Sequence, residues 1–162
     1  MKLLIAGIIK ESVVDGPGLR YVIFTQGCPH HCVGCHNPNT QDFAGGYEVP
    51  IAKLLDSINE TKLIDGVTFS GGEPFAQAAA CAELAKLIKQ KRSDLNIITY
   101  SGYYYAELLA MAIKDSAIEG FLQSIDILID GPYDATKNDP NLPFRGSSNQ
   151  NIIYLKKHLI IR

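Results

Sequence analysis

Neither charge predominates in this sequence, because 15 lysines and arginines face 17 aspartates and glutamates, which gives a formal net charge of −2. Nucleic-acid-binding surfaces are strongly basic, so this balance argues against a nucleic-acid partner. Long hydrophobic runs are also absent. The amino-terminal apolar stretch ends before Lys10, whereas a membrane-spanning helix needs about 20 apolar residues. With no secretory signal pattern either, we expect a cytoplasmic protein that does not contact a membrane.

Cysteine is scarce and unevenly placed. Cys28, Cys32 and Cys35 lie within eight residues, and Cys81 stands alone. A secreted disulfide framework spreads an even set of cysteines along the chain, whereas clustered thiols in a reducing compartment bind metal. A chain of 162 residues also buries enough surface to fold without disulfides. We expect one domain, residues 1–162, with Cys81 as a small buried residue.

Short apolar runs alternate with helical patterns along the chain. From residue 67 onward the runs start about 30 residues apart, the length of a βαβ unit, so the pattern predicts an α/β fold with a parallel sheet. A complete eightfold barrel takes roughly 250 residues; we therefore expect a partial (open) βα barrel. The predicted strands are residues 1–10, 21–25, 67–70, 96–100, 125–130 and 158–162, and the predicted helices are residues 50–60, 74–92 and 105–114.

The segment from Gly27 to Pro38 follows a predicted strand and contains a C-x3-C-x2-C pattern. Thiolates suit iron, and one loop could wrap three of them around one face of a cubane iron–sulfur cluster. Because a four-iron cluster has four corners, one iron would stay open to a small molecule. The alternative is a zinc site in which His30, His31 or His36 is the fourth ligand.

A Gly-Gly-Glu turn follows the predicted strand 67–70. Gly71 and Gly72 lack Cβ atoms, so a ligand can approach their backbone closely. Their carbonyls could face an ammonium group, and the carboxylate of Glu73 could pair with it. Taken alone the turn is weak evidence, because glycine before a helix-starting proline is common.

Together, the three-cysteine loop and the Gly-Gly-Glu turn resemble the radical S-adenosylmethionine enzymes. In that family the open iron chelates the amino and carboxylate groups of S-adenosylmethionine. One electron from the reduced cluster then cleaves it to methionine and a 5′-deoxyadenosyl radical, which abstracts a hydrogen atom. The resemblance implies a [4Fe-4S] cluster on Cys28, Cys32 and Cys35; nucleoside contacts from Gly34, Cys35 and His36; amino-group contacts from Gly71, Gly72 and Glu73; and carboxylate or ribose contacts from Thr99, Ser101 and Asp130. The last three residues are equally well explained as ordinary polar residues at strand ends.

Further stretches of the sequence resemble particular groups within this family. Residues 14–20, 35–38 and 130–133 look like glycyl-radical-enzyme activases, and residues 142–150 look like the activating proteins of anaerobic (class III) ribonucleotide reductases. This implies hydrogen abstraction from a backbone glycine of the reductase, with a reduced flavodoxin-type electron donor. The alternatives are an activating enzyme of the pyruvate formate-lyase type, a carboxy-deazaguanine synthase, and a non-catalytic iron–sulfur or zinc module.

Two features near the predicted site have more than one interpretation. Arg145 could meet the partner protein or the cofactor carboxylate, or form a structural salt bridge. Tyr103, Tyr104 and Tyr105 could touch substrate, but a half-buried aromatic rim at a helix start explains them equally simply.

Overall fold

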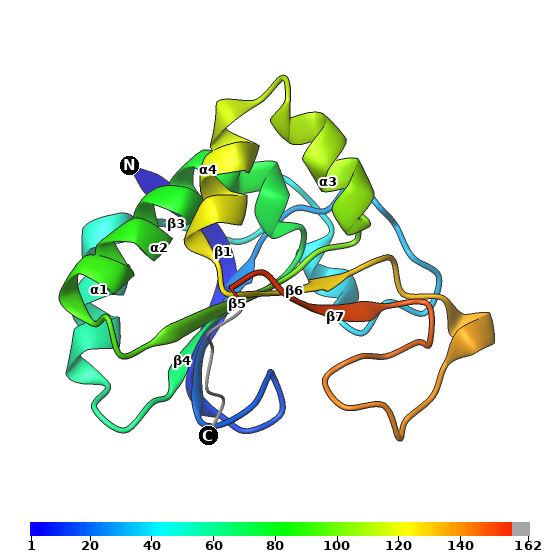
Figure 1. Ribbon diagram of the computed structural model, residues 1–162, viewed down its shortest axis with the longest axis horizontal. Helices are drawn as coiled ribbons and strands as arrows, with labels where there is room; N and C mark the ends of the chain where they lie inside the picture. The colour runs from blue at the N-terminus through cyan, green and yellow to red at the C-terminus, as the bar shows by residue number, and fades with distance from the viewer. Residues whose placement is uncertain (157–162) are drawn as a thin grey trace.

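The structure, a computed structural model, describes residues 1–156. Its centre is a seven-stranded sheet in the order β3-β1-β2-β4-β5-β6-β7 (Figure 1). The two outermost strands, β3 and β7, do not pair with each other, so the sheet formed by the described residues is open. The strands are β1 Lys2–Ser12, β2 Arg20–Thr25, β3 Tyr47–Pro50, β4 Gly66–Gly71, β5 Asn96–Tyr100, β6 Ile127–Asp130 and β7 Asn151–Tyr154.

The central strands β2, β4, β5 and β6 are parallel, as the spacing of the apolar runs predicts. The predicted open α/β fold with a parallel sheet is therefore confirmed at its centre. The edges need a correction, because β1, β3 and β7 pair antiparallel to their neighbours. Strands β3 and β7 have only four residues each and no fully buried side chain, so no apolar run indicates them. The predicted run 158–162 lies outside the described residues.

Four α-helices cover one face of the sheet (Figure 1). Three correspond to predicted helices, although the first turn of the predicted 74–92 helix is a separate 3-10 helix, Pro74–Gln77. The fourth was not predicted: it is short, contains Gly120, and starts where the Asp115 side chain accepts a hydrogen bond from the Ala117 amide. None of these helices has the length and hydropathy needed to cross a membrane. The helices are α1 Ile51–Glu60, α2 Ala78–Lys91, α3 Tyr105–Ala112 and α4 Ser116–Ser124.

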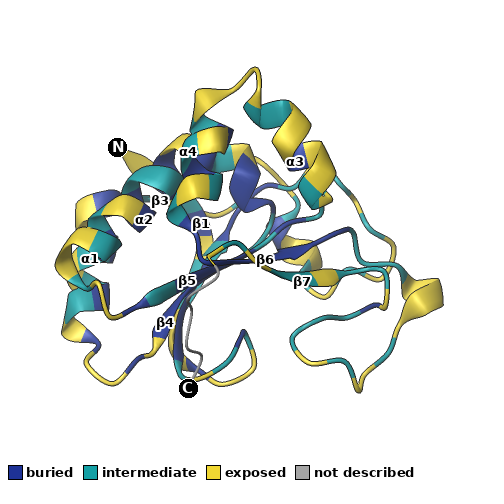
Figure 2. Cartoon of the chain, viewed as in Figure 1, coloured by how far each residue is buried: buried dark blue, intermediate teal, exposed yellow. Residues whose placement is uncertain are grey.

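The main core lies between the helices and the sheet, where the buried residues concentrate (Figure 2). Phe121 of α4 meets Phe69 of β4 and Phe75 at ring-centroid distances of 5.5 and 4.7 Å. Side chains alternate along a strand, so Ile97 of β5 enters this core while its neighbour Ile98 enters a smaller cluster on the opposite face. The sheet is thus buried on both faces, which explains its continuous apolar runs.

The opposite face is covered by two loops, residues 13–19 and 131–150, rather than by α-helices of the described chain (Figure 1). Arg20 holds the first loop and is fully buried. Its guanidinium donates to Pro17 O at 3.3 Å, Thr68 Oγ1 at 3.0 Å and Val67 O at 2.9 Å. Burial lowers the pKa of Arg20 to about 10, so the group remains a cation at neutral pH.

Cys81 lies in α2 as a buried member of the main core, and burial raises the pKa of its thiol. Replacing Cys81 with alanine removes one buried sulfur atom, so we expect the free energy of unfolding to fall by about 1 kcal/mol. Urea denaturation of the metal-free protein measures this change. A loss of cluster binding in this variant would contradict the placement of Cys81 in the core.

Candidate active site

A cleft of about 570 Å³ lies at the carboxyl ends of the parallel strands, on the face without α-helices. In open α/β sheets this edge is where ligands bind. The cleft is lined by residues that the sequence analysis singled out, Cys28, Cys32, Cys35, His36, Gly71, Gly72 and Ser101, and by Phe144 and Gln150 of the stretch 142–150. It is also lined by residues that were not singled out, among them Ile9, Phe24 and Tyr100.

The cysteine loop, residues 27–38, follows β2, and hydrogen bonds to the residues just after the loop close it at its base. Gly27 N donates to Thr40 O at 2.7 Å, and Cys28 N donates to Gln41 O at 3.0 Å. Positive φ angles at Gly27, His31 and Gly34 wind the intervening backbone without regular structure. Cys28, Cys32 and Cys35 are half-buried free thiols that all line the cleft.

The surroundings of the loop histidines bear on the zinc alternative. Within residues 1–156, no three His, Cys, Asp or Glu side chains are gathered closely enough to hold a single metal ion. His30 Nε2 lies 2.7 Å from Glu73 Oε2, and the His36 ring packs against Tyr133 with centroids 4.7 Å apart. The three thiols line the cleft together with His30 and His36, and a set of three thiolates suits iron–sulfur chemistry. Burial raises the pKa of the Cys28 thiol.

The glycine turn, residues 70–74, packs directly on the start of the cysteine loop. Gly72 N donates to Thr25 O and Glu73 N donates to Gly27 O, both at 2.8 Å. Gly71 has a φ of +90°, and a Cβ atom there would lie 2.7 Å from Thr25 O. Glycine is required because a side chain would push the turn away from β2.

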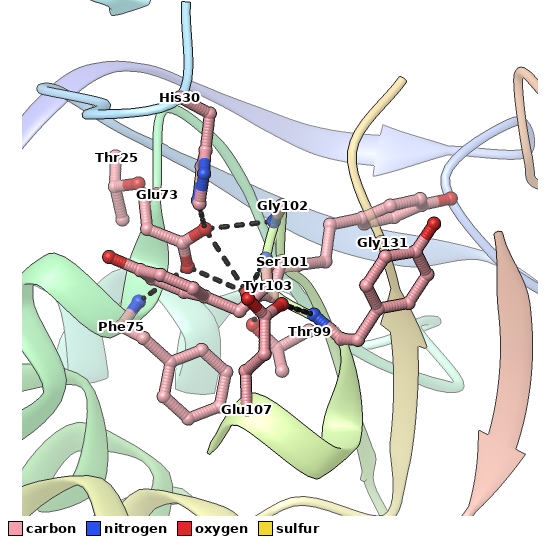
Figure 3. A network of polar contacts seen from close by, with 12 residues as sticks. Thr25, His30, Glu73, Phe75, Thr99, Ser101, Gly102, Tyr103, Glu107 and Gly131 are labelled. Atoms are coloured by element: carbon pink, nitrogen blue, oxygen red, sulfur yellow. Dashed lines mark hydrogen bonds and ion pairs between the residues drawn. The ribbon is translucent and has the colours of Figure 1, made fainter. Parts of the chain in front are cut away.

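The carboxylate of Glu73 is fully buried and joins three segments of the chain (Figure 3). Oε1 accepts from Phe75 N at 3.0 Å and Oε2 from Gly102 N at 2.8 Å, while Ser101 Oγ donates within 3.1 Å of both oxygens. A carboxylate only accepts, so His30 Nε2 carries the hydrogen in its contact with Oε2. The chain's own donors thus occupy the carboxylate that the sequence analysis assigned to a ligand ammonium group.

Of the three residues predicted to contact the carboxylate or ribose of S-adenosylmethionine, one lines the cleft and two do not. Ser101 lines the cleft and donates to Glu73, whereas Thr99 and Asp130 do not line the cleft. Thr99 is fully buried within β5. Asp130 is also buried, and it accepts from Tyr105 N at 2.8 Å and from Asn151 Nδ2 at 2.9 Å. Both residues thus have the surroundings of strand-end polar groups, and their ligand contacts remain predictions.

Tyr100 and Tyr103 both lie near the cleft. Tyr100 ends strand β5, and Tyr103 lies in the loop between β5 and α3. Tyr103 packs edge-on against His30 with ring centroids 4.4 Å apart, which supports the position of the cysteine loop. Tyr100 was missed because it ends an apolar run and so resembled a core residue. Its hydroxyl donates to Phe144 O at 2.8 Å and ties the loop 131–150 to β5. Nothing in the sequence pairs these two positions.

Comparisons with known proteins agree with the donor set. Residues 14–153 match a family described as a 4Fe-4S single cluster domain. The anaerobic ribonucleoside-triphosphate reductase-activating protein of Vibrio cholerae is 34% identical over 145 residues, which cover 86% of this chain and 90% of that protein. The protein of the same description from Pasteurella multocida is 36% identical over 149 residues, covering 88% and 91%. The pyruvate formate-lyase-activating enzyme of Clostridium pasteurianum is 41% identical over 106 residues, which cover 62% of this chain but 44% of that enzyme.

Proposed function

This chain belongs to the 4Fe-4S family of anaerobic ribonucleoside-triphosphate reductase-activating proteins, and we propose that it generates the glycyl radical of such a reductase. The observation that carries the proposal is the cleft, which brings the three thiols of the cysteine loop beside the glycine turn. These are the two elements that the radical S-adenosylmethionine chemistry of activating enzymes requires.

The cysteine loop suits a cluster with one open iron. Cys28, Cys32 and Cys35 would hold three irons and leave the fourth to the amino and carboxylate groups of S-adenosylmethionine. A reduced cluster held there would supply the one electron needed to break the sulfur–C5′ bond of S-adenosylmethionine, giving methionine and a 5′-deoxyadenosyl radical. Abstraction of one α-hydrogen from glycine would then yield 5′-deoxyadenosine and the glycyl radical.

The residues around the loop position the nucleotide. The backbone of Gly34, Cys35 and His36 would contact the nucleoside, and the carbonyls of Gly71 and Gly72 would accept from the methionine amino group. Glu73 supports this arrangement from behind, because its bond to His30 fixes the cysteine loop and its backbone amide fixes the turn. Holding the reacting groups together makes electron transfer effectively intramolecular.

The cleft suits a protein substrate. None of its lining residues comes from β7 or from the two described residues that follow it, and Lys156 instead lies beside α3 and α4. A glycine-bearing loop of a larger protein would thus enter without displacing the described end of the chain. A reduced flavodoxin-type protein is the proposed electron donor.

The nearest alternative is an activating enzyme of the pyruvate formate-lyase type, which the Clostridium pasteurianum similarity favours. The two reductase-activating relatives are preferred because they match this chain over about nine tenths of their own length. The non-catalytic alternative is an iron–sulfur carrier, which needs no open corner on its cluster.

One experiment distinguishes these functions. The protein is reconstituted with iron and sulfide without oxygen, reduced, and mixed with S-adenosylmethionine, with and without the reductase. We expect 5′-deoxyadenosine, and a glycyl radical on the reductase detected by electron paramagnetic resonance. Absence of 5′-deoxyadenosine from an intact reduced cluster would indicate a carrier. A radical on pyruvate formate-lyase but not on the reductase would indicate the other activating enzyme.

A further inference from the structure

Arg145 lies in the wall of the cleft with part of its hydrogen-bonding capacity unused. Its Nη1 donates to Gln150 O at 3.1 Å. Its Nε is buried and has no hydrogen-bond partner among residues 1–156. Within residues 1–156, no carboxylate lies within 4.0 Å of its guanidinium. The structural salt bridge considered for Arg145 is therefore not formed by the described residues.

The backbone on both sides of Arg145 is held by hydrogen bonds, which restricts where its guanidinium can lie. Phe144 has a φ of +59°, a strained value for a bulky residue, and the Tyr100 hydroxyl holds its carbonyl. On the other side, the amides of Gly146 and Ser147 donate to Gln150 Oε1 at 2.9 and 3.1 Å. Strained residues of this kind persist where the surrounding structure holds them, and they cluster at ligand sites.

The charges in the cleft indicate what the guanidinium would bind. Among the described residues that line the cleft, Arg145 is the one lysine or arginine; the lining also includes Asp15, two histidines and three cysteines. The Nε–Nη2 edge of a guanidinium matches the two oxygens of a carboxylate. A buried Nε without a partner is costly, and an arriving carboxylate would remove that cost. This edge is left over once Nη1 has bonded to Gln150.

We propose that Arg145 is the carboxylate-binding residue of the cleft. The carboxylate has two sources that share this chemistry, the α-carboxylate of S-adenosylmethionine and an acidic group on the reductase. This inference rests on the proposed function for the identity of both. It adds a residue that positions a substrate, and it requires no change in the chemical step.

The test measures binding first, so that it does not depend on turnover. Equilibrium dialysis of the cluster-loaded, oxidised protein compares S-adenosylmethionine with its decarboxylated analogue, for the wild type, Arg145→Gln and Arg145→Lys. If Arg145 meets the carboxylate of S-adenosylmethionine, each variant loses roughly 10- to 100-fold in affinity for it. The same variants then bind the decarboxylated analogue almost as the wild type does. Lysine fails to rescue because it lacks the planar fork.

The second measurement identifies a carboxylate on the reductase. At saturating S-adenosylmethionine, the reductase concentration that gives half-maximal radical formation rises at least 10-fold in Arg145→Gln, while its affinity for S-adenosylmethionine is unchanged. The matched control is Arg92→Gln, because Arg92 pairs with Asp94 at the end of α2, outside the cleft. We expect Arg92→Gln to change neither quantity.

Two outcomes would overturn the inference. One is that Arg145→Gln, with an unchanged cluster content and unfolding curve, alters neither affinity. The other is that it weakens both adenosyl compounds equally. If Arg145→Gln does not fold, Tyr100→Phe provides the test, because it frees the carbonyl of Phe144 and should weaken the same ligand selectively. If the wild type binds S-adenosylmethionine but forms no 5′-deoxyadenosine, the proposed function fails while the binding result stands.

Discussion

Replacing any one of Cys28, Cys32 or Cys35 with alanine is expected to reduce 5′-deoxyadenosine formation by more than about 100-fold. Loss of residues that merely support metal ligands already costs 10- to 100-fold, and loss of a ligand itself costs more. The three thiols share one loop and face one cleft, so no thiol can be spared. Iron and sulfide content after reconstitution, together with the cleavage assay, measures the effect.

Cys81→Ala is the matched control, because it is the same chemical change at the fourth cysteine. Cys81 is in α2 and belongs to the core on the other side of the sheet, so cluster content and cleavage should stay near the wild-type level. The ligand assignment is wrong if Cys81 proves essential, or if one of the three loop cysteines can be replaced without loss.

Replacing Glu73 with alanine is expected to lower the free energy of unfolding of the metal-free protein by about 3–5 kcal/mol. The carboxylate is fully buried, and its removal leaves the amides of Phe75 and Gly102 and the ring of His30 without their acceptor. Urea denaturation without oxygen measures the change. Glu73→Gln distinguishes the effect of the charge from that of the side-chain volume. Glutamine fills nearly the same space, but its NH₂ group donates hydrogen bonds and so cannot accept from some of the donors that Glu73 contacts.

Glu107→Ala is the control for this prediction. Glu107 is also a glutamate at the start of a helix, but it is exposed and accepts one bond, from Tyr104 N at 2.7 Å. Its loss should cost about 1 kcal/mol. If the Glu73 and Glu107 variants unfold at the same urea concentration, the buried carboxylate is not the structural link described above.

The centre of the fold was predictable because burial on both faces of β2, β4, β5 and β6 produces apolar runs that need no knowledge of the partner strand. The edge strands β3 and β7 were not, since each is defined by pairing with a distant strand while its own side chains stay partly exposed. Helix α4 was missed because Gly120 and its short length weaken the local pattern.

The candidate site likewise has parts that local sequence patterns predict and parts that depend on residues distant in the sequence. The cysteine spacing and the Gly-Gly-Glu turn are local patterns, and the structure places both at the cleft. The carboxylate of Glu73 accepts hydrogen bonds from Ser101 and His30, which lie 28 and 43 positions away from it in the sequence. The sequence therefore does not predict that the chain's own donors occupy this carboxylate. The same holds for Arg145, whose unpaired Nε is a property of the folded loop.

The cysteine loop is held at its start by backbone hydrogen bonds to Thr40, Gln41 and the glycine turn, and it contributes no residue to either apolar core. We therefore expect the protein scaffold to fold without metal, unlike small metal-dependent domains that unfold when the metal is removed. On that expectation, loss of the cluster in air leaves the polypeptide folded, and the same molecule can take up a new cluster.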